Sequence, residues 1–271
     1  MCVSPAAVGQ QMRQLEDLLG QDLFDRSRQL PQLNPVGKAM VPKAREVIHA
    51  YDTLMTRGGV DEEMNGELTL GALPSMIRRL IPSAVKMLVA ANPGLHIRVI
   101  PGEAHDLQEQ VERGALDAAV VSKSGEMDAS INWQPFAEEE LVLIASPDTN
   151  EHDPYKLIVS QPFIRHARWT AVGQLADEWL ARHKINIHAS MEMESLDNLA
   201  SMVAHGLGIS VVPNLCMPDP VFENLLKLPL GEDNISRVVG LLSRHDSPKS
   251  RLIEGLYQQI GSTIEQYKTT L

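Results

Sequence analysis

Apolar and polar positions follow two different periods along this chain, and the period changes near residue 66. In the first segment the apolar residues recur at spacings of four, three and four, as on one face of a helix: Val8, Met12, Leu15 and Leu19. Ser4 followed by Pro5 is suited to begin that helix, and Gly20 to end it. This segment is therefore expected to be helical up to a short polar loop that ends near Leu33.

A second, longer helix is predicted after Asn34, an N-cap residue followed by Pro35. Its apolar stripe has near-heptad spacing and consists of Val36, Met40, Ala44, Val47, Ile48, Tyr51, Leu54 and Met55. A helix between two domains has no core of its own to cover such a stripe, so a partner helix in a dimer is the economical explanation. Packing against the following domain is the alternative.

From Gly66 onward the pattern changes to alternating strands and helices. Strands are predicted at residues 67–73, 95–99, 117–121, 141–145, 163–165, 209–212 and 238–242, and helices at 75–91, 106–113, 172–182, 196–204 and 248–267. This alternation predicts an α/β fold with helices on the faces of a parallel sheet. Glycines and acidic residues at 57–66 indicate a linker before it.

Charge divides the chain at the same place. The formal net charge of −11 comes from 24 basic and 35 acidic residues, which argues against a nucleic-acid binder if the chain is taken whole. Residues 1–60, however, hold seven Lys or Arg and six Asp or Glu, a net charge of +1, so the remainder carries −12. The two parts are therefore expected to have different partners.

The composition gives little support to catalysis, metal binding or a membrane partner. The chain has no Gly-x-Ser-x-Gly, P-loop or His-Glu-x-x-His motif, and neither Cys2 nor Cys216 has partners at zinc spacing. It has no long apolar run and no segment resembling a signal peptide. We expect a cytoplasmic protein that is not an enzyme and needs no cofactor.

Several motifs resemble one known family, the LysR-type transcriptional regulators. Residues 3–16, Leu19-Gly20, residues 23–26 and residues 33–37 are similar to that family's recognition helix, wing and start of the linker helix. Residues 66–71, 114–117, 140–143 and 205–213 resemble its effector domain, in the same order. The resemblance implies a two-lobed, periplasmic-binding-protein-like α/β effector domain, preceded by a truncated winged helix-turn-helix and a long linker helix.

The resemblance also implies a domain organisation and partners. Residues 1–34 would be a partial winged helix-turn-helix, 35–60 the linker and dimerisation helix, and 66–271 the effector domain. Lobe I would comprise 66–139 and 242–271 and lobe II 140–241, with crossings near Phe136–Glu140 and Leu241–Leu242. The implied partners are operator DNA, a small-molecule effector and further copies of the chain in a homodimer or homotetramer. A stand-alone cytoplasmic sensor with the same effector fold is the alternative function.

The candidate DNA contacts lie in the first 28 residues: Ser4, Pro5, Ala6, Ala7, Gln10, Gln11, Arg13, Arg26 and Arg28. Gln can pair with adenine and Arg with guanine, and the two wing arginines suit phosphates. A solvated helix face is the alternative interpretation. Family members have two further helices before the recognition helix, so we expect this chain to be a truncated product that binds its operator poorly.

The candidate effector contacts follow strands of both lobes: Ser75, Met76, Gly102, Glu103, Arg165, His166 and Ser195. Ligands of open α/β sheets bind at the carboxyl ends of strands. Two helix N-termini near Ser75 and Ser195, together with the planar fork of Arg165, would suit a small organic acid. The alternatives are that the serines only cap their helices and that the charged residues belong to solvated surface loops.

Overall fold

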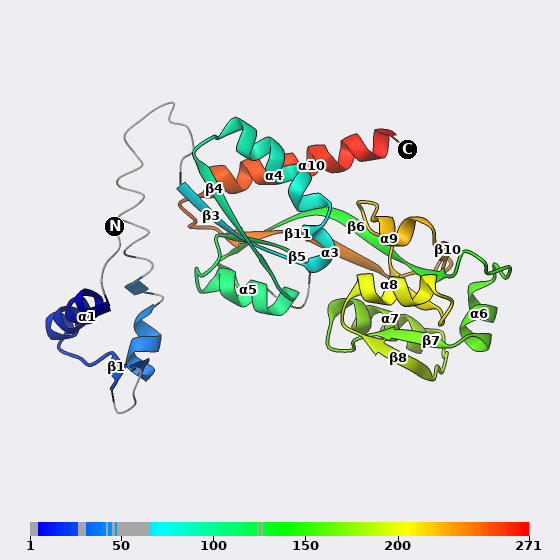
Figure 1. Ribbon diagram of the computed structural model, residues 1–271, viewed down its shortest axis with the longest axis horizontal. Coiled ribbons are helices and arrows are strands. Elements are labelled where there is room, and N and C mark those ends of the chain that lie inside the picture. Colours follow the sequence, from blue (N-terminus) through cyan, green and yellow to red (C-terminus); the bar gives the residue numbers. More distant parts are fainter. Residues whose placement is uncertain are drawn as a thin grey trace. The chain divides into compact units, whose positions relative to one another are not determined.

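The computed structural model describes residues 5–26, 31–41, 43–44, 47, 66–123, 125 and 127–270. The chain forms two compact units, Met1–Val60 and Asp61–Leu271 (Figure 1). The boundary between them lies within the segment 57–66, where glycines and acidic residues predict a linker. Each unit is described by itself below.

The N-terminal unit contains helix α1 (Pro5–Leu19), strands β1 (Phe24–Asp25) and β2 (Gln32–Leu33), and helical residues 35–41. Two of the predicted caps are confirmed, while Ser4 lies outside the described residues: Gly20 follows α1 with φ 66°, and the Asn34 side chain accepts a hydrogen bond from the Gly37 backbone N–H at 2.8 Å. Gly37 packs so closely that a Cβ there would lie 2.2 Å from the Leu23 carbonyl oxygen. Most of the predicted dimer helix, including everything from residue 48 to 60, lies outside the described residues.

Lobe I of the C-terminal unit is built on three parallel strands in the order β4-β3-β5. Its elements are β3 (Gly66–Ala72), α3 (Pro74–Ile77), α4 (Leu80–Ala91), β4 (Leu95–Pro101), α5 (Ala104–Glu112), β5 (Ala118–Ser122) and α10 (Ser250–Thr270). Helices α4 and α10 cover one face of this sheet and α5 the other (Figure 1). The expected parallel pairing is confirmed for these three strands, and β11 (Ser236–Arg244) adds an antiparallel strand beside β5 when the chain returns from the second lobe.

The single helix expected at 75–91 is two helices, α3 and α4, separated by Arg78 and Arg79. Pro82 explains the interruption. Proline has no N–H to donate to the carbonyl four residues earlier, and its ring clashes with that carbonyl, so a helix continuing through Arg78 is disfavoured. In the first turn of α4 the same proline is tolerated, because the N–H groups there have no helical partner in any case.

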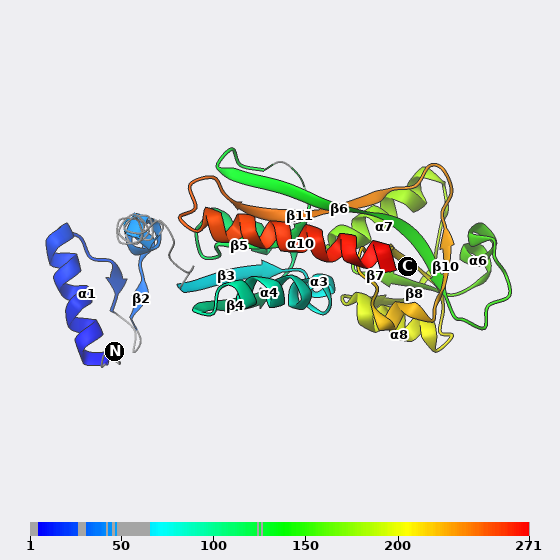
Figure 2. The same ribbon diagram turned by 90° about the horizontal axis from the view of Figure 1, so that it is seen from above.

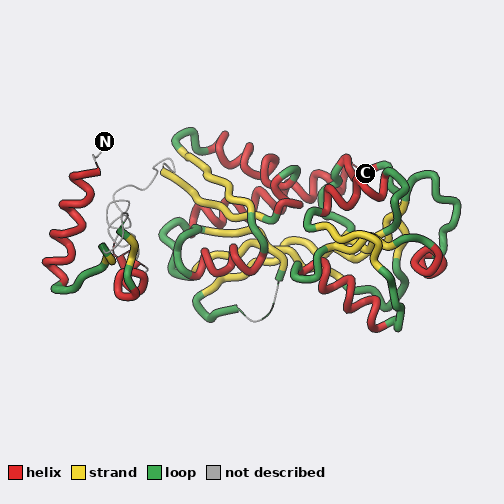
Figure 3. Tube along the Cα trace, turned by 60° about the horizontal axis from the view of Figure 1, so that its bottom comes forward, coloured by secondary structure: helices red, strands yellow, loops and turns green. Residues whose placement is uncertain are grey.

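Lobe II holds the remaining elements: α6 (Pro154–Ser160), β7 (Phe163–His166), α7 (Ala171–Arg182), β8 (Ala189–Met193), α8 (Leu196–Ala204), β9 (Ser210–Pro213), α9 (Pro220–Glu223) and β10 (Leu226–Pro229). Two buried apolar clusters, distinct from the lobe I core, hold it together. Met191 and Met193 are half-buried and pack against one of them. Figure 3 shows helices packed around the strands in both lobes.

Strand β6 (Ile131–Ala145) runs from lobe I into lobe II, and β11 pairs with its first part as an antiparallel ribbon (Figure 2). Their pairing ends at Glu140 opposite Ser236, after which β6 pairs with β9 and β10 of lobe II. The second crossing expected at Leu241–Leu242 is therefore misplaced, because both leucines are fully buried in the lobe I core. We define lobe I as residues 66–140 and 236–270, and lobe II as 141–235.

Candidate functional site

A cavity of about 140 Å³ lies between the two lobes of the C-terminal unit, and we call it the cleft. Both lobes supply its walls, among them Ser75, Glu103 and Ser122 from lobe I and His166, Glu194 and Ser195 from lobe II. Each of these residues lies at the end of a strand or the beginning of a helix. The position agrees with the rule that α/β sheets bind ligands beyond the carboxyl ends of their strands.

Four of the seven predicted effector residues line the cleft: Ser75, Glu103, His166 and Ser195. Ser195 caps α8 as expected, accepting a hydrogen bond from the Asn198 backbone N–H at 3.4 Å. Ser75 does not cap its helix. The N-cap of α3 is Leu73, which makes no side-chain cap, so the Ser75 hydroxyl is placed within the first turn.

The other three predicted residues do not line the cleft. Met76 is only 2% exposed and belongs to the lobe I core, and the backbone of Gly102 packs against the Leu107 side chain. Arg165 is buried and its guanidinium forms an ion pair with Asp177 on α7. The ligand-binding role expected for Arg165 therefore lacks geometric support, because its Nη1 contacts Asp177 within lobe II and the residue does not line the cleft.

His166 presents a defined hydrogen-bonding edge. The Thr170 hydroxyl donates its single proton to the Ala167 carbonyl at 2.7 Å, so it can only accept from His166 Nδ1, which lies 2.7 Å away. The ring proton is thus on Nδ1, and Nε2 is a lone-pair acceptor. Burial, followed by the positive charge of Arg237, lowers the pKa of His166 to about 4, which keeps the ring neutral at physiological pH.

Arg237 is a cleft residue that the sequence interpretation missed. It lies opposite Glu139 in the β6–β11 ribbon, and its Nε donates to Glu139 Oε2 at 2.8 Å while Nη2 contacts the same oxygen. The other carboxylate oxygen accepts the Cys216 backbone N–H at 2.7 Å. Both side chains are almost fully buried, at 3% and 0% exposure. Glu139 and Arg237 are oppositely charged residues close to two predicted strands, but they are 98 positions apart in the sequence. Only the strand register reveals that they pair.

Two further carboxylates of the cleft have no cation partner among the described residues, namely Glu103 and Glu194. Burial is the largest cause that raises the pKa of Glu103, and the nearby negative charges of Asp106 and Glu194 raise it further. The positive charge of Arg237 opposes this shift, and the cleft lining holds more acidic than basic side chains.

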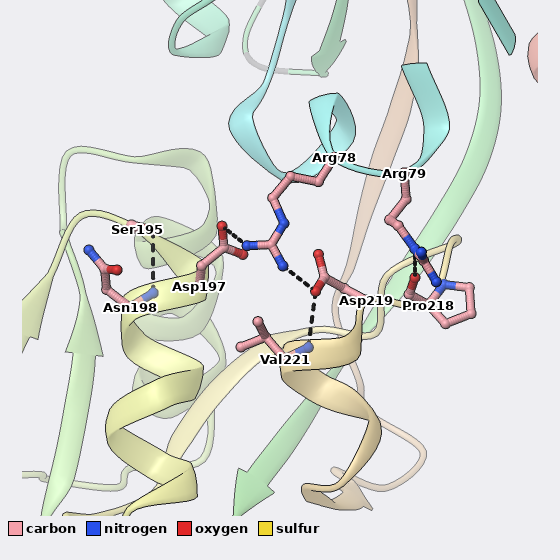
Figure 4. A network of polar contacts seen from close by, with 8 residues as sticks. All are labelled: Arg78, Arg79, Ser195, Asp197, Asn198, Pro218, Asp219 and Val221. Carbon is pink, nitrogen blue, oxygen red and sulfur yellow. Dashed lines mark hydrogen bonds and ion pairs between the residues drawn. The ribbon is translucent and has the colours of Figure 1, made fainter. Parts of the chain in front are cut away.

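Arg78, in the turn between α3 and α4, joins the lobes beside the cleft (Figure 4). Its Nη1 lies 2.6 Å from Asp197 at the start of α8, and Nη2 contacts Asp219, whose side chain is 2% exposed. Arg79 adds a hydrogen bond from Nε to the Pro218 carbonyl at 2.9 Å. We call the Arg78 contacts with Asp197 and Asp219 the Arg78 bridge. It exists because Pro82 interrupts the helix and places two arginines in a turn.

In the N-terminal unit, the polar residues Gln10, Gln11 and Arg13 are exposed on α1 and available to a partner. Of the other predicted DNA contacts, Ala7 is half-buried, Pro5 and Ala6 begin α1 without a described side-chain environment, and Ser4 and Arg28 lie outside the described residues. Arg26 is engaged: its guanidinium contacts Glu16.

Glu16 was missed, and it organises the turn after α1. Although it lies in a polar stretch, it is only 5% exposed and accepts backbone hydrogen bonds from Leu23 at 2.8 Å and Phe24 at 3.1 Å. The Arg26 side chain is the largest cause that lowers the pKa of Glu16. Arg26 therefore helps to hold this turn, which limits its freedom to follow a phosphate.

Two kinds of site are missing from the described part of the chain. No three His, Cys, Asp or Glu side chains there are grouped as metal ligands would be. None of the described helices combines the length and the apolar character that crossing a membrane requires.

Comparison with known protein families accounts for most of the chain. The LysR substrate binding domain matches residues 61–264, and the bacterial regulatory helix-turn-helix protein of the lysR family matches residues 1–38. A hydrogen peroxide-inducible genes activator of Haemophilus influenzae is 28% identical over 275 residues, covering 97% of this chain and 87% of that protein. The HTH-type transcriptional activator IlvY of Salmonella typhimurium is 26% identical, covering 95% and 90%.

Solved structures show the same fold. Full-length OxyR from Pseudomonas aeruginosa, a point variant, superposes with a TM-score of 0.75 at 22% identity, over 95% of this chain and 86% of that one. Full-length BenM gives a TM-score of 0.62 at 19% identity, over 99% and 90%. With one family model matching most of the chain and a second matching its N-terminal unit, this protein belongs to the LysR family of bacterial transcriptional regulators, which are not enzymes.

Proposed function

We propose that this regulator is controlled by a small molecule that binds non-covalently in the cleft and draws on walls from both lobes. The observation that carries the proposal is the composition of the cleft, in which strand ends and helix starts of lobe I and lobe II converge on one cavity. A ligand held by both lobes would bind one relative arrangement of them better than another. Differential affinity of that kind is what allows a ligand to shift a conformational equilibrium.

The relatives named as hydrogen peroxide-inducible genes activators raise the question of a thiol switch. In the described part of this chain Cys216 is the only cysteine, and it packs half-buried against the lobe I core. Burial, followed by the negative charge of Glu139, raises the pKa of the Cys216 thiol far above its ordinary value. Because the thiolate is the reactive form, Cys216 is poorly suited to react with peroxide, which favours a non-covalent effector.

For the DNA-binding unit, we propose that Gln10, Gln11 and Arg13 read bases, because they are exposed on α1 and have side chains that can pair with adenine or guanine. Arg26 is assigned to the turn held by Glu16. The predicted dimer, with its helix at residues 35–60, is retained in the proposal because operator sites of helix-turn-helix proteins reflect the twofold symmetry of a dimer.

Footprinting on the DNA upstream of the protein's own gene tests the DNA-binding part. We expect a protected region with the wild-type chain, and about tenfold or more weaker protection with Arg13→Ala, since a good base contact is worth about 1–3 kcal/mol. Arg251→Ala, an exposed arginine at the start of α10, serves as the matched control and should leave protection unchanged. Equal losses in both variants would contradict base reading by Arg13.

The cleft is tested separately with Ser75→Phe, which places a large side chain in the cavity without removing a cap. A compound that alters the wild-type footprint should have no effect on this variant, while the footprint itself persists. If Ser75→Phe responds to the compound as the wild type does, the effector site lies elsewhere.

A further inference from the structure

The cleft is short of positive charge, and each of its charged groups can be accounted for. Arg237 is paired with the buried Glu139, although its positive charge still acts on Glu103 and His166, and Asp197 is paired with Arg78 through the Arg78 bridge. What remains are the carboxylates of Glu103 and Glu194, which come from opposite lobes. Glu103 is half-buried and Glu194 is exposed, and the negative charge of Glu194 raises the pKa of Glu103. A cation placed between the two carboxylates would relieve their repulsion.

A second observation, independent of the acids, also points to a hydrogen-bond donor. The His166 residue is only 6% exposed, its Nδ1–H is satisfied by Thr170, and none of the described residues pairs with its Nε2. Because the ring is neutral, Nε2 is an acceptor that a ligand in the cleft can reach. A carboxylate ligand has no proton to offer it, whereas an amine or guanidinium has several.

The structure also removes the reasons for expecting an organic acid. Arg165, the cation chosen for a carboxylate, is paired with Asp177 away from the cleft. Helix α3, whose N-terminus was to favour an anion, has only four residues, Pro74–Ile77. At the N-terminus of the other helix, α8, the Ser195 side chain already accepts the Asn198 backbone N–H, so that donor is not free for an anion.

We propose, building on the proposed function of the cleft, that the effector is a small cationic molecule carrying an amine, amidine or guanidine group. That group lies between Glu103 and Glu194 and donates a hydrogen bond to Nε2 of His166. A binding step of this kind neutralises both carboxylates and draws the two lobes toward a common ligand. The same arrangement discriminates against carboxylates, since they would meet two like charges and an acceptor nitrogen.

The test compares two probes of nearly the same shape and opposite charge, benzamidine and benzoate, on the full chain. Agmatine and succinate form a second pair of a cation and an anion. Thermal melting followed by calorimetric titration should show stabilisation by benzamidine or agmatine and none by either acid, because a ligand that binds the folded state raises its stability.

Variants then locate the site. Glu103→Gln and Glu194→Gln keep side-chain size but remove charge, and each should weaken binding of the cation about tenfold or more, as expected for a hydrogen bond to a charged group. Glu232→Gln, in an exposed loop, is the matched control and should bind as the wild type does. Melting curves without probe show whether each variant is folded.

Binding of benzoate or succinate in preference to the cations, no binding of either cation, or cation binding that is unaffected by both cleft variants would each overturn the inference. The proposed function is contradicted by different results. These are a Ser75→Phe variant that loses the footprint itself, or one that responds to the compound as the wild type does. Acid binding that Ser75→Phe abolishes would refute only the ligand class and leave the cleft as the effector site.

Discussion

The buried pair of Glu139 and Arg237 supports a prediction about stability that can be worked from its contacts. Replacing Arg237 with Met removes the only cation among the described residues that contacts the Glu139 carboxylate, whose side chain is 0% exposed. It leaves that carboxylate with one neutral donor, the Cys216 backbone N–H. Breaking a buried ion pair by removing one partner costs about 3–5 kcal/mol. Because domains are stable by about 5–15 kcal/mol, that loss is a large fraction of the whole.

The double variant Arg237→Met/Glu139→Leu removes both charges and supplies the comparison. It no longer buries an isolated carboxylate, and its remaining defect is the Cys216 N–H without an acceptor, which costs about 1–3 kcal/mol. We therefore expect the double variant to be more stable than Arg237→Met alone by about 2 kcal/mol. The coupling follows from the double-mutant cycle of the two residues.

Urea unfolding followed by tryptophan fluorescence is the assay, because all three tryptophans lie in the C-terminal unit: Trp133, Trp169 and Trp179. The measurement therefore reports on the unit that contains the ion pair. If Arg237→Met is as stable as the wild type, or if the double variant is less stable than the single one, the Glu139 carboxylate is not isolated by the loss of Arg237 and the reasoning is refuted.

Three further predictions concern other parts of the chain. Gly37→Ala should destabilise the N-terminal unit, measured by circular dichroism, because its Cβ would overlap a backbone carbonyl; an unchanged melting curve would contradict this. The free energy of unfolding of the wild type, relative to that of His166→Asn, should fall by up to about 3 kcal/mol as the pH drops from 6.5 to 4. The reason is that the unfolded state binds a proton that the folded ring, with pKa about 4, does not. A difference in urea stability between the two proteins that stays constant over this pH range would refute the prediction. Arg78→Ala should lower the free energy of unfolding, measured with urea, by about 1–3 kcal/mol, because it leaves the buried Asp219 without its cation. Asp197→Asn changes a more exposed contact and should lower it by less than about 1 kcal/mol. The reverse order would contradict the Arg78 bridge.

Much of the architecture was predictable because it depends on local signals. Gly20 ends α1, Asn34 caps the next helix and Ser195 caps α8, since each acts on backbone groups within a few residues. The alternation of strands and helices likewise follows from the spacing of apolar residues, which can be read within each segment without knowing its neighbours in space. The helix break before Leu80 was available to the same reasoning through Pro82, but the apolar stripe on both sides concealed it.

The cleft was harder to predict because its chemistry depends on pairs that are distant in sequence. Arg165 and Arg237 look alike as isolated basic residues, yet one pairs with Asp177 and the other faces the cleft beside Glu139. Only the strand register and helix packing decide between them. The preference for a cation over an acid reverses the sequence-based expectation for the same reason, since it depends on which charges are already neutralised.

The β6–β11 ribbon has a mechanical consequence for any signal that starts in the cleft. Separating the lobes along the ribbon would stretch two covalent strands at once, whereas twisting it leaves the hydrogen-bonded ladder intact. A bulge between Val239 and Gly240, opposite Pro135, interrupts the ladder and increases the local twist. The compliant direction is therefore torsion about the ribbon axis. A ligand that draws both lobes toward the cleft would therefore turn one lobe relative to the other about this axis.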